Sequence, residues 1–226
     1  MMSSKSRTVI IVAGGKGERM NSDVPKQFLL VHNQPILMHT IRLFHRFDSG
    51  CGIIVVLPES QQLYWQQLCA DHHFDIPHAV VAGGASRFFS VKNGLKPAPD
   101  EGLIAIHDGV RPLASITTLE RCFQSAALSN AAIPVTDAVE SIRTLTPSGS
   151  MAVDRSLFKL VQTPQVFEAS LLKKAYEQEY SILFTDDASV VEAYGHPVEL
   201  VEGNPENIKV TTPGDLKIAE ALIQQI

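Results

Sequence analysis

The stretch Thr8-Val9-Ile10-Ile11-Val12-Ala13-Gly14-Gly15-Lys16-Gly17 decides the fold class of this chain. Its first part, Thr8 to Ala13, is a short apolar run rich in β-branched side chains, which predicts a buried strand. Glycines end the run at once, and glycines allow backbone amides to approach a phosphate closely. We therefore expect a buried first strand that leads directly into an anion-binding loop.

Apolar runs of the same kind recur along the chain and alternate with helical patterns. Consecutive apolar positions imply strands that are buried on both faces, and the further runs are Gly52 to Leu57, Ala79 to Val81, Leu103 to Ile106 and Ala132 to Val135. Apolar side chains share one helical face at 36–44 and again at 119–127. The alternation predicts an α/β fold with a Rossmann-like, mainly parallel sheet, helices on both sides and ligands at the carboxyl ends of the strands.

The C-terminal part of the chain continues this pattern. We expect helices near 169–178 and 188–194, a final helix from Gly214, and strands near 198–201 and 208–210.

The segment Asp137 to Val153 breaks the alternation. The apolar residues Val139, Ile142 and Leu145 recur there among polar ones, and the turn-forming run Thr146 to Ser150 follows. We predict a β-hairpin arm at 137–153 within a single domain that spans residues 1–226. Composition leaves two interpretations about even, namely a surface loop and an arm that reaches a second subunit.

The composition is that of an ordinary globular protein. The chain has 226 residues, of which 45% are hydrophobic and 19% charged, so it can bury a sizeable core. Its formal net charge of −5 argues against binding nucleic acid through phosphate attraction, because such domains usually carry a basic excess. No apolar run reaches the length of a membrane span, and we expect a cytoplasmic protein with neither membrane nor nucleic-acid partners. The three cysteines lack the spacing of a zinc site or a disulfide framework.

The glycine loop matches neither of the common phosphate-binding motifs. A dinucleotide fingerprint would have glycine in place of Met20, and Lys16-Gly17-Glu18 does not continue as a Walker loop would. The loop does carry two cations, Arg19 and Lys26, the second of which follows Pro25. Transfer of a phosphoryl-type group needs such fixed positive charge over developing oxyanions. On this loop alone, that role and a glycine turn with solvated cations are about equally favoured.

Six motifs in order along the chain give a more specific indication. They are Ala13-Gly14-Gly15-Lys16-Gly17-Glu18-Arg19-Met20 with Pro25-Lys26-Gln27, then Val81 to Val91, Ile106 to Pro112, Val153-Asp154-Arg155 with Gln162 to Gln165, Thr185 to Ser189 and Glu202 to Val210. In these motifs the chain resembles the 2-C-methyl-D-erythritol 4-phosphate cytidylyltransferases of the non-mevalonate isoprenoid pathway. The resemblance implies a fold of the nucleotide-diphospho-sugar transferase type with a protruding hairpin. It also implies transfer of CMP from CTP to 2-C-methyl-D-erythritol 4-phosphate, with release of pyrophosphate.

The resemblance further implies roles for individual residues. Arg19 and Lys26 would stabilise the charge at the α-phosphorus, while Arg155 and Lys209 would hold the acceptor phosphate for in-line attack. Other contacts to the two substrates would come from Ala13, Gly14, Gly15, Gly17, Gly83, Gly84, Ser90, Asp108, Arg111, Ala138 and Thr163, with the second glycine segment against the cytosine. Because a phosphate monoester is already anionic near neutral pH, no side-chain nucleophile or general base is required.

A metal ion and a second subunit belong to the same expectation. Asp108 would bind Mg²⁺ or another divalent cation that bridges the triphosphate. The alternatives are that Asp108 hydrogen-bonds a ribose hydroxyl or its own turn, and that Arg111 is its structural partner. A homodimer formed through the arm would bring Arg155 to the neighbouring subunit's acceptor site.

Three competing functions stay open at the level of sequence. Many members of the family that the chain resembles have threonine where this chain has Ala138, which leaves a ribitol 5-phosphate cytidylyltransferase as the first alternative. A non-catalytic nucleotide-binding module is the second, although the retained Arg19, Lys26, Arg155 and Lys209 argue against it. A nicotinamide oxidoreductase is the third, and the absence of glycine at the Met20 position weakens it.

Overall fold

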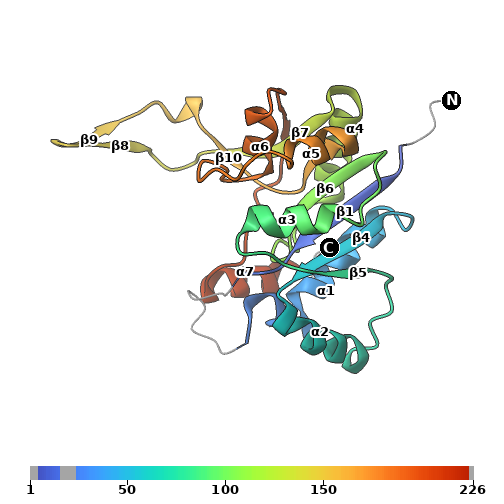
Figure 1. Ribbon diagram of the computed structural model, residues 1–226. Coiled ribbons are helices and arrows are strands. Elements are labelled where there is room, and N and C mark those ends of the chain that lie inside the picture. The colour runs from blue at the N-terminus through green and yellow to red at the C-terminus, as the bar shows by residue number, and fades with distance from the viewer. Residues whose placement is uncertain (1–4, 16–23, 224–226) are drawn as a thin grey trace.

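A sheet of eight strands runs through the centre of the protein (Figure 1). The structure is a computed structural model, and it describes residues 5–15 and 24–223. The strands in chain order are β1 (Arg7–Val12), β4 (Gly52–Leu57), β5 (Ala79–Ala82), β6 (Leu103–Asp108), β7 (Ala131–Asp137), β10 (Lys159–Val161), β11 (Gln165–Glu168) and β12 (Glu199–Glu202). Their spatial order is β10-β7-β11-β6-β1-β4-β5, with β12 paired to β7 as well.

The sheet is mainly parallel, as predicted. β1 pairs in parallel with both β4 and β6, and β4 pairs in parallel with β5. The short strand β11 lies antiparallel between β6 and β7, and β10 is antiparallel to β7. The parallel half therefore brings the ends of β1, β4, β5 and β6 to one edge, where the glycine segments follow.

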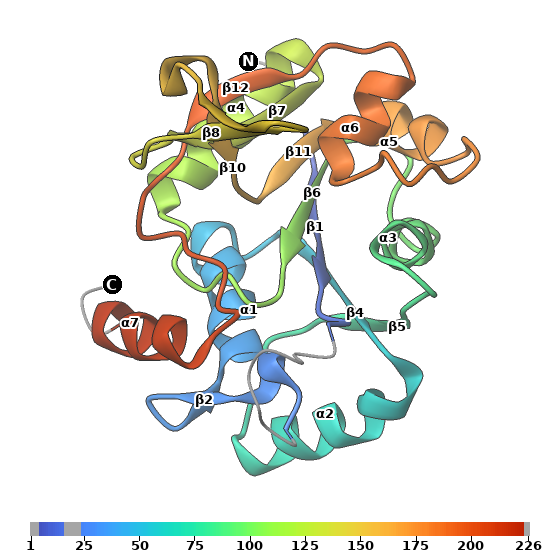
Figure 2. The same ribbon diagram turned by 90° about the vertical axis from the view of Figure 1, so that its left-hand side faces the viewer.

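Helices cover both faces of this sheet, and Figure 2 shows the strands between the two helical layers. One layer contains α1 (Ile36–Phe47), α2 (Glu59–Asp71) and α4 (Ile116–Ser129), and the other contains α3 (Arg87–Leu95), α5 (Ala169–Ala175) and α6 (Asp187–Ala193). Val9 and Ile11 of β1 belong to the first core, and Ile10 belongs to the second. Burial on both faces explains why the sequence of β1 is apolar at consecutive positions.

Smaller elements complete the edge at which the parallel strands end. They are the 3₁₀ turn η2 (Lys26–Phe28), the short strands β2 (Leu30–Val31) and β3 (Gln34–Pro35), and the helix α7 (Pro213–Ile223). Val31, Val110 and Ala219 pack together in a third apolar cluster. None of the helices in the part of the chain that the structure describes is long and apolar enough to cross a membrane.

The predicted hairpin is present as an arm that projects from the body of the protein (Figure 1). It consists of β8 (Arg143–Thr146) and β9 (Gly149–Ala152), which pair antiparallel with each other and with no strand of the main sheet. Gly149 closes the turn at a φ of 138°, which a residue with a side chain rarely adopts. The predicted span was too wide, because Asp137 still belongs to β7.

Two other predictions about local structure were wrong. Residues 208–210 form no strand, although Val210 is fully buried and its amide donates to the carbonyl of Val110 at 2.9 Å. The apolar pattern there reflects packing against α7 and the turn after β6, with no sheet ladder. The helix expected to reach Gln178 ends at Ala175.

Candidate active site

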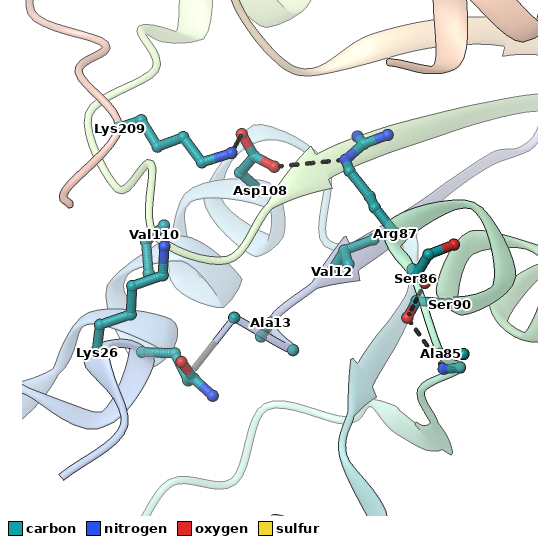
Figure 3. Close-up of a pocket in the computed structure, with 14 residues that line it drawn as sticks. Val12, Ala13, Lys26, Ala85, Ser86, Arg87, Ser90, Asp108, Val110 and Lys209 are labelled. Carbon is teal, nitrogen blue, oxygen red and sulfur yellow. Dashed lines mark hydrogen bonds and ion pairs between the residues drawn. The ribbon is translucent and has the colours of Figure 1, made fainter. Parts of the chain in front are cut away.

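The edge formed by the parallel strands contains a cavity of about 250 Å³ (Figure 3). Backbone hydrogen bonds extend the sheet just beyond the ends of the strands, from Ala13 to Val56 at 2.9 Å and from Gly83 to Leu57 at 2.8 Å. The cavity is lined by Val12, Ala13, Gly14, Gly15, Lys26, Gln27, Gly84, Ala85, Ser86, Arg87, Ser90, Asp108, Val110 and Lys209. Of the predicted site residues, eight come together in this one cavity: Ala13, Gly14, Gly15, Lys26, Gly84, Ser90, Asp108 and Lys209.

The second glycine segment forms one wall of the cavity at the start of α3. The Gly84 amide donates to Ser90 Oγ at 3.0 Å, and Ser90 Oγ donates to the Ser86 carbonyl at 2.9 Å. A Cβ at Gly84 would lie 2.4 Å from the Cβ of Phe89, a distance that real atoms do not adopt. Glycine is therefore required here by close packing. Gly83, which was predicted to contact the base, is not among the residues that line the cavity.

Lys26 reaches the opposite wall from the 3₁₀ turn η2. Gln27 and Phe28 of the same turn are buried, and Phe28 stacks on Trp65 with ring centroids 6.0 Å apart. This packing fixes the turn. A Cβ at Gly15 would lie 2.9 Å from Lys26 Cε, so the glycine allows the lysine chain to pass close to the loop. Figure 3 shows Lys26 opposite Ser86 and Ser90 across the cavity.

Asp108 ends β6 in the midst of three cations. Its Oδ2 lies 3.0 Å from Lys209 Nζ and 3.1 Å from Arg111 Nε, and its Oδ1 lies 3.9 Å from Arg87 Nε. Burial alone would raise the pKa of this carboxyl, but the three cations outweigh burial and hold the pKa of Asp108 well below its usual range. Asp108 is therefore a fixed negative charge at neutral pH.

His107 beside it serves to hold the strand end in place. Its Nδ1 lies 2.9 Å from Thr163 Oγ1, and its Nε2 lies 2.9 Å from the Arg111 carbonyl. A carbonyl only accepts, so the ring proton is on Nε2. The Thr163 hydroxyl therefore donates to Nδ1, and it accepts from the Asp108 amide at 3.1 Å. Burial lowers the pKa of His107 to about 4, so the ring is neutral. This network ties β6 to the segment before β11.

Lys209 is placed by the segment that was predicted to be a strand. Asn207 is fully buried, and its side-chain amide donates to the Thr163 carbonyl at 2.8 Å. Arg111 Nη1 donates to the Asn207 carbonyl at 2.7 Å. With Val210 anchored to Val110 as well, Lys209 extends from a rigid backbone toward Asp108.

A second cavity, of about 300 Å³, adjoins the first. It is lined by Arg87, Asp108, Arg111, Val161, Gln162, Thr163, Gln165, Thr185, Asp186 and Lys209. Arg87, Asp108 and Lys209 line both cavities and thus mark the junction between them. The predicted residues Arg111 and Thr163 lie in this second cavity. An arrangement of two cavities with a charged junction suits a reaction between two anionic substrates.

The remaining predicted residues are not brought to these cavities. Arg155, in the 3₁₀ turn η3 (Arg155–Leu157), is exposed and donates to the Val139 carbonyl at the base of the arm. Ala138 is buried beside the arm and lines neither cavity. Gly17 and Arg19 lie outside the residues that the structure describes.

The structure adds residues for which the sequence suggested no role, above all Arg87, Gln165 and Asp186. Arg87 is the first residue of α3. A cation is unfavourable at the positive N-terminal end of a helix, but no helix was predicted at 87–95, so this sign of an anionic partner could not be read from the sequence.

Comparison with known proteins points to one family. The family model described as 2-C-methyl-D-erythritol 4-phosphate cytidylyltransferase matches residues 7–225. The protein of that name from Bacteroides fragilis is 59% identical over 217 residues, which are 96% of this chain and 99% of the relative. The protein of the same name from Porphyromonas gingivalis is 49% identical over 97% of this chain and 98% of the relative.

Solved structures give the same result. The crystal structure of the cytidylyltransferase from Thermus thermophilus superimposes with a TM-score of 0.77 at 31% identity, covering 98% of this chain and all of the other. The 4-diphosphocytidyl-2C-methyl-D-erythritol synthase from Anaerococcus prevotii superimposes with a TM-score of 0.82 at 26% identity, with the same coverage. The resemblance seen in the sequence is thereby confirmed, and this chain belongs to the 2-C-methyl-D-erythritol 4-phosphate cytidylyltransferase family.

Proposed function

We propose that this chain transfers CMP from CTP to 2-C-methyl-D-erythritol 4-phosphate, which yields 4-diphosphocytidyl-2-C-methyl-D-erythritol and pyrophosphate in isoprenoid precursor biosynthesis. The observation that carries this proposal is the pair of adjoining cavities that share Arg87, Asp108 and Lys209. Family membership names the substrates. A cytoplasmic location stays a prediction from the sequence.

The first cavity would take CTP and the second the acceptor. The glycine loop and Lys26 would face the triphosphate, and the segment Gly84 to Ser90 would face the cytosine. The attacking atom is an oxygen of the acceptor phosphate, which forms the new bond to the α-phosphorus as the bond to pyrophosphate breaks. No proton needs to leave a hydroxyl, so the side chains act by position and charge alone. Lys209, at the junction, would hold the two reacting phosphates together.

Mg²⁺ fits the chemistry of the junction. In nucleotide sites this ion is held by one or two carboxylates together with phosphates and waters. Asp108 Oδ2 contacts Lys209 and Arg111, whereas Oδ1 lies 3.9 Å from Arg87 Nε and could bind a metal. Among residues 5–15 and 24–223, no group of three or more His, Cys, Asp or Glu side chains could hold a metal by itself. Substrate phosphates would therefore supply further ligands, and the ion would offset their charge.

We also propose that the protein is a homodimer joined through the arm. Large apolar side chains of the arm region are exposed, including Leu145 at 86% and Leu157 at 79%. A second subunit would cover them and could bring Arg155 to the acceptor cavity. Light scattering should give twice the monomer mass for the parent protein. For Leu145→Glu it should give the mass of a single monomer. Leu128→Glu is the matched control, because Leu128 is also 86% exposed but lies on α4. A parent protein that is fully active as a monomer would contradict this proposal.

The acceptor is the part of the proposal that needs direct measurement, because Ala138 offers no hydroxyl. Pyrophosphate release should be assayed with CTP and Mg²⁺ in the presence of either methylerythritol phosphate or ribitol phosphate, with ATP, GTP and UTP as controls. We expect release with CTP and methylerythritol phosphate. Preference for ribitol phosphate would keep the chemistry and change the substrate, whereas no release with any pair would favour a nucleotide-binding module.

A further inference from the structure

Arg87 lies at the junction of the two cavities, yet neither cavity explains its orientation. It lines both cavities together with Asp108 and Lys209. Figure 3 shows Lys209 and Arg87 approaching Asp108 from opposite sides. Arg87 is also the first residue of α3, where the helix dipole disfavours a cation. Something other than its own helix must therefore hold it there.

That partner is the buried carboxylate of Asp187. Arg87 Nη1 donates to Oδ1 at 2.9 Å and Nη2 donates to Oδ2 at 2.6 Å, a two-pronged pair that fixes the plane of the guanidinium. The side chain of Asp187 is completely buried, and Tyr176 Oη donates to its Oδ1 at 2.6 Å. Because both terminal nitrogens of Arg87 are bound to Asp187, its Nε is the atom left to face Asp108.

Asp187 is itself fixed to the sheet. It is the first residue of α6, and Asp186 caps this helix by accepting from the Ser189 amide at 2.9 Å. Gln165 of β11 donates to Asp186 Oδ2 at 2.8 Å and accepts from the Ala188 amide at 2.9 Å. The position of Arg87 is therefore set by β11 and the start of α6, elements that lie far from it in the sequence.

The distance from Arg87 to Asp108 has a chemical consequence. At 3.9 Å the guanidinium attracts the carboxylate without forming a hydrogen bond to Oδ1. An Arg87 that was not held by Asp187 could turn toward Asp108, bond to Oδ1 and draw the carboxylate away from Lys209. The Arg87–Asp187 pair thus keeps Asp108 Oδ1 directed at the junction, and the three cations around Asp108 stay separate.

We propose that Arg87 is a positioning residue for the transfer reaction: held by Asp187 and Tyr176, it sets the orientation of Asp108 where nucleotide and acceptor meet. This inference rests on the proposed function. It predicts that the Arg87–Asp187 pair matters more for turnover and for the acceptor than for CTP binding, because Asp187 lines neither cavity and Lys26 lies across the first cavity from Arg87 (Figure 3).

The test compares Asp187→Asn and Tyr176→Phe with the parent. Asn is isosteric with Asp but lacks its charge, so Arg87 loses its fixed orientation. We expect kcat to fall by up to about 100-fold and the acceptor KM to rise, as for a misplacement of about 1 Å. Tyr176→Phe removes one hydrogen bond and keeps the ring stacked on Phe88, so a smaller fall in kcat of about tenfold or less is expected. CTP affinity, measured by calorimetry without acceptor, should stay close to that of the parent in both.

Asp48→Asn is the matched control. Arg7 Nη1 and Asp48 Oδ2 form another arginine–aspartate pair, a partly exposed one with a single contact at 3.2 Å, at the other end of β1 and away from both cavities. This variant should lose some stability toward denaturant and keep the kinetic constants of the parent. Arg87→Lys keeps the charge without the two-pronged geometry, so its kcat should fall as that of Asp187→Asn does.

Several outcomes would overturn the inference. If kcat and the acceptor KM of Asp187→Asn equal those of the parent, or if CTP affinity falls as steeply as kcat, Arg87 does not act through Asp108. If Asp187→Asn fails to fold, an unchanged kcat in Tyr176→Phe refutes the inference by itself. A parent protein that forms no product would instead refute the proposed function, so the two failures are distinguishable.

Discussion

Lys209→Met separates the contribution of Lys209 to catalysis from its contribution to stability. Its Nζ lies 3.0 Å from Asp108 Oδ2, and at an effective dielectric constant of about 20 this pair attracts by about 5.5 kcal/mol before desolvation. The side chain of Lys209 is 41% exposed, however, and partly exposed pairs retain about 1 kcal/mol or less of net stability. Asp108 would also keep its contact with Arg111 at 3.1 Å. We therefore expect the free energy of unfolding, measured with denaturant, to change by less than about 1 kcal/mol.

The effect on turnover should be far larger. Removal of one preorganised donor to a developing anionic charge costs about 100- to 1,000-fold in rate, which corresponds to about 3–4 kcal/mol. Pyrophosphate release under saturating CTP and acceptor would measure it. Lys173→Met is the control, because Lys173 also forms a lysine–aspartate pair, with Asp100, but lies outside both cavities. Near-normal turnover in Lys209→Met, or a loss of activity no larger than the loss of folded protein, would refute this reasoning.

Three further results are expected. Gly84→Ala should weaken CTP binding in calorimetry and cost about 1–3 kcal/mol of stability, because its Cβ would overlap Phe89; in the control Gly214→Ala the nearest atom would be 3.6 Å away. His107 is neutral in the folded protein, since burial lowers its pKa from 6.5 to about 4, so up to about 3 kcal/mol of stability present above pH 6.5 should be lost as the pH falls toward 4. Denaturant curves of His107→Gln should lack this component, and equal pH dependence in both proteins would contradict it. Burial raises the pKa of Cys51 and Cys122 to about 12, so neither should be alkylated at pH 8 until the protein unfolds; rapid labelling seen by mass spectrometry would count against the burial of these thiols.

The sequence by itself determined the class of fold and the loops that form the site. Consecutive apolar residues in β1 required burial on both faces, because alternate side chains of a strand point to opposite sides of a sheet. Val9 and Ile10 accordingly enter different cores. Glycines that directly follow the parallel strands in the sequence likewise predicted that the loops lie at one edge of the sheet. Gly84 could therefore be recognised as a residue of that edge before its close contact with Phe89 was known.

Only the tertiary structure decided which charges meet. Arg87 and Asp187 are separated by 100 positions, and the His107–Thr163 contact by 56. Nothing in a local pattern relates such residues, because their distance depends on β11 lying antiparallel between β6 and β7. The same holds for residues 208–210, whose apolar pattern suggested a strand although Val210 packs against α7 instead. Periodicity reports which side chains are buried, whereas the partner of each buried charge is set by long-range packing.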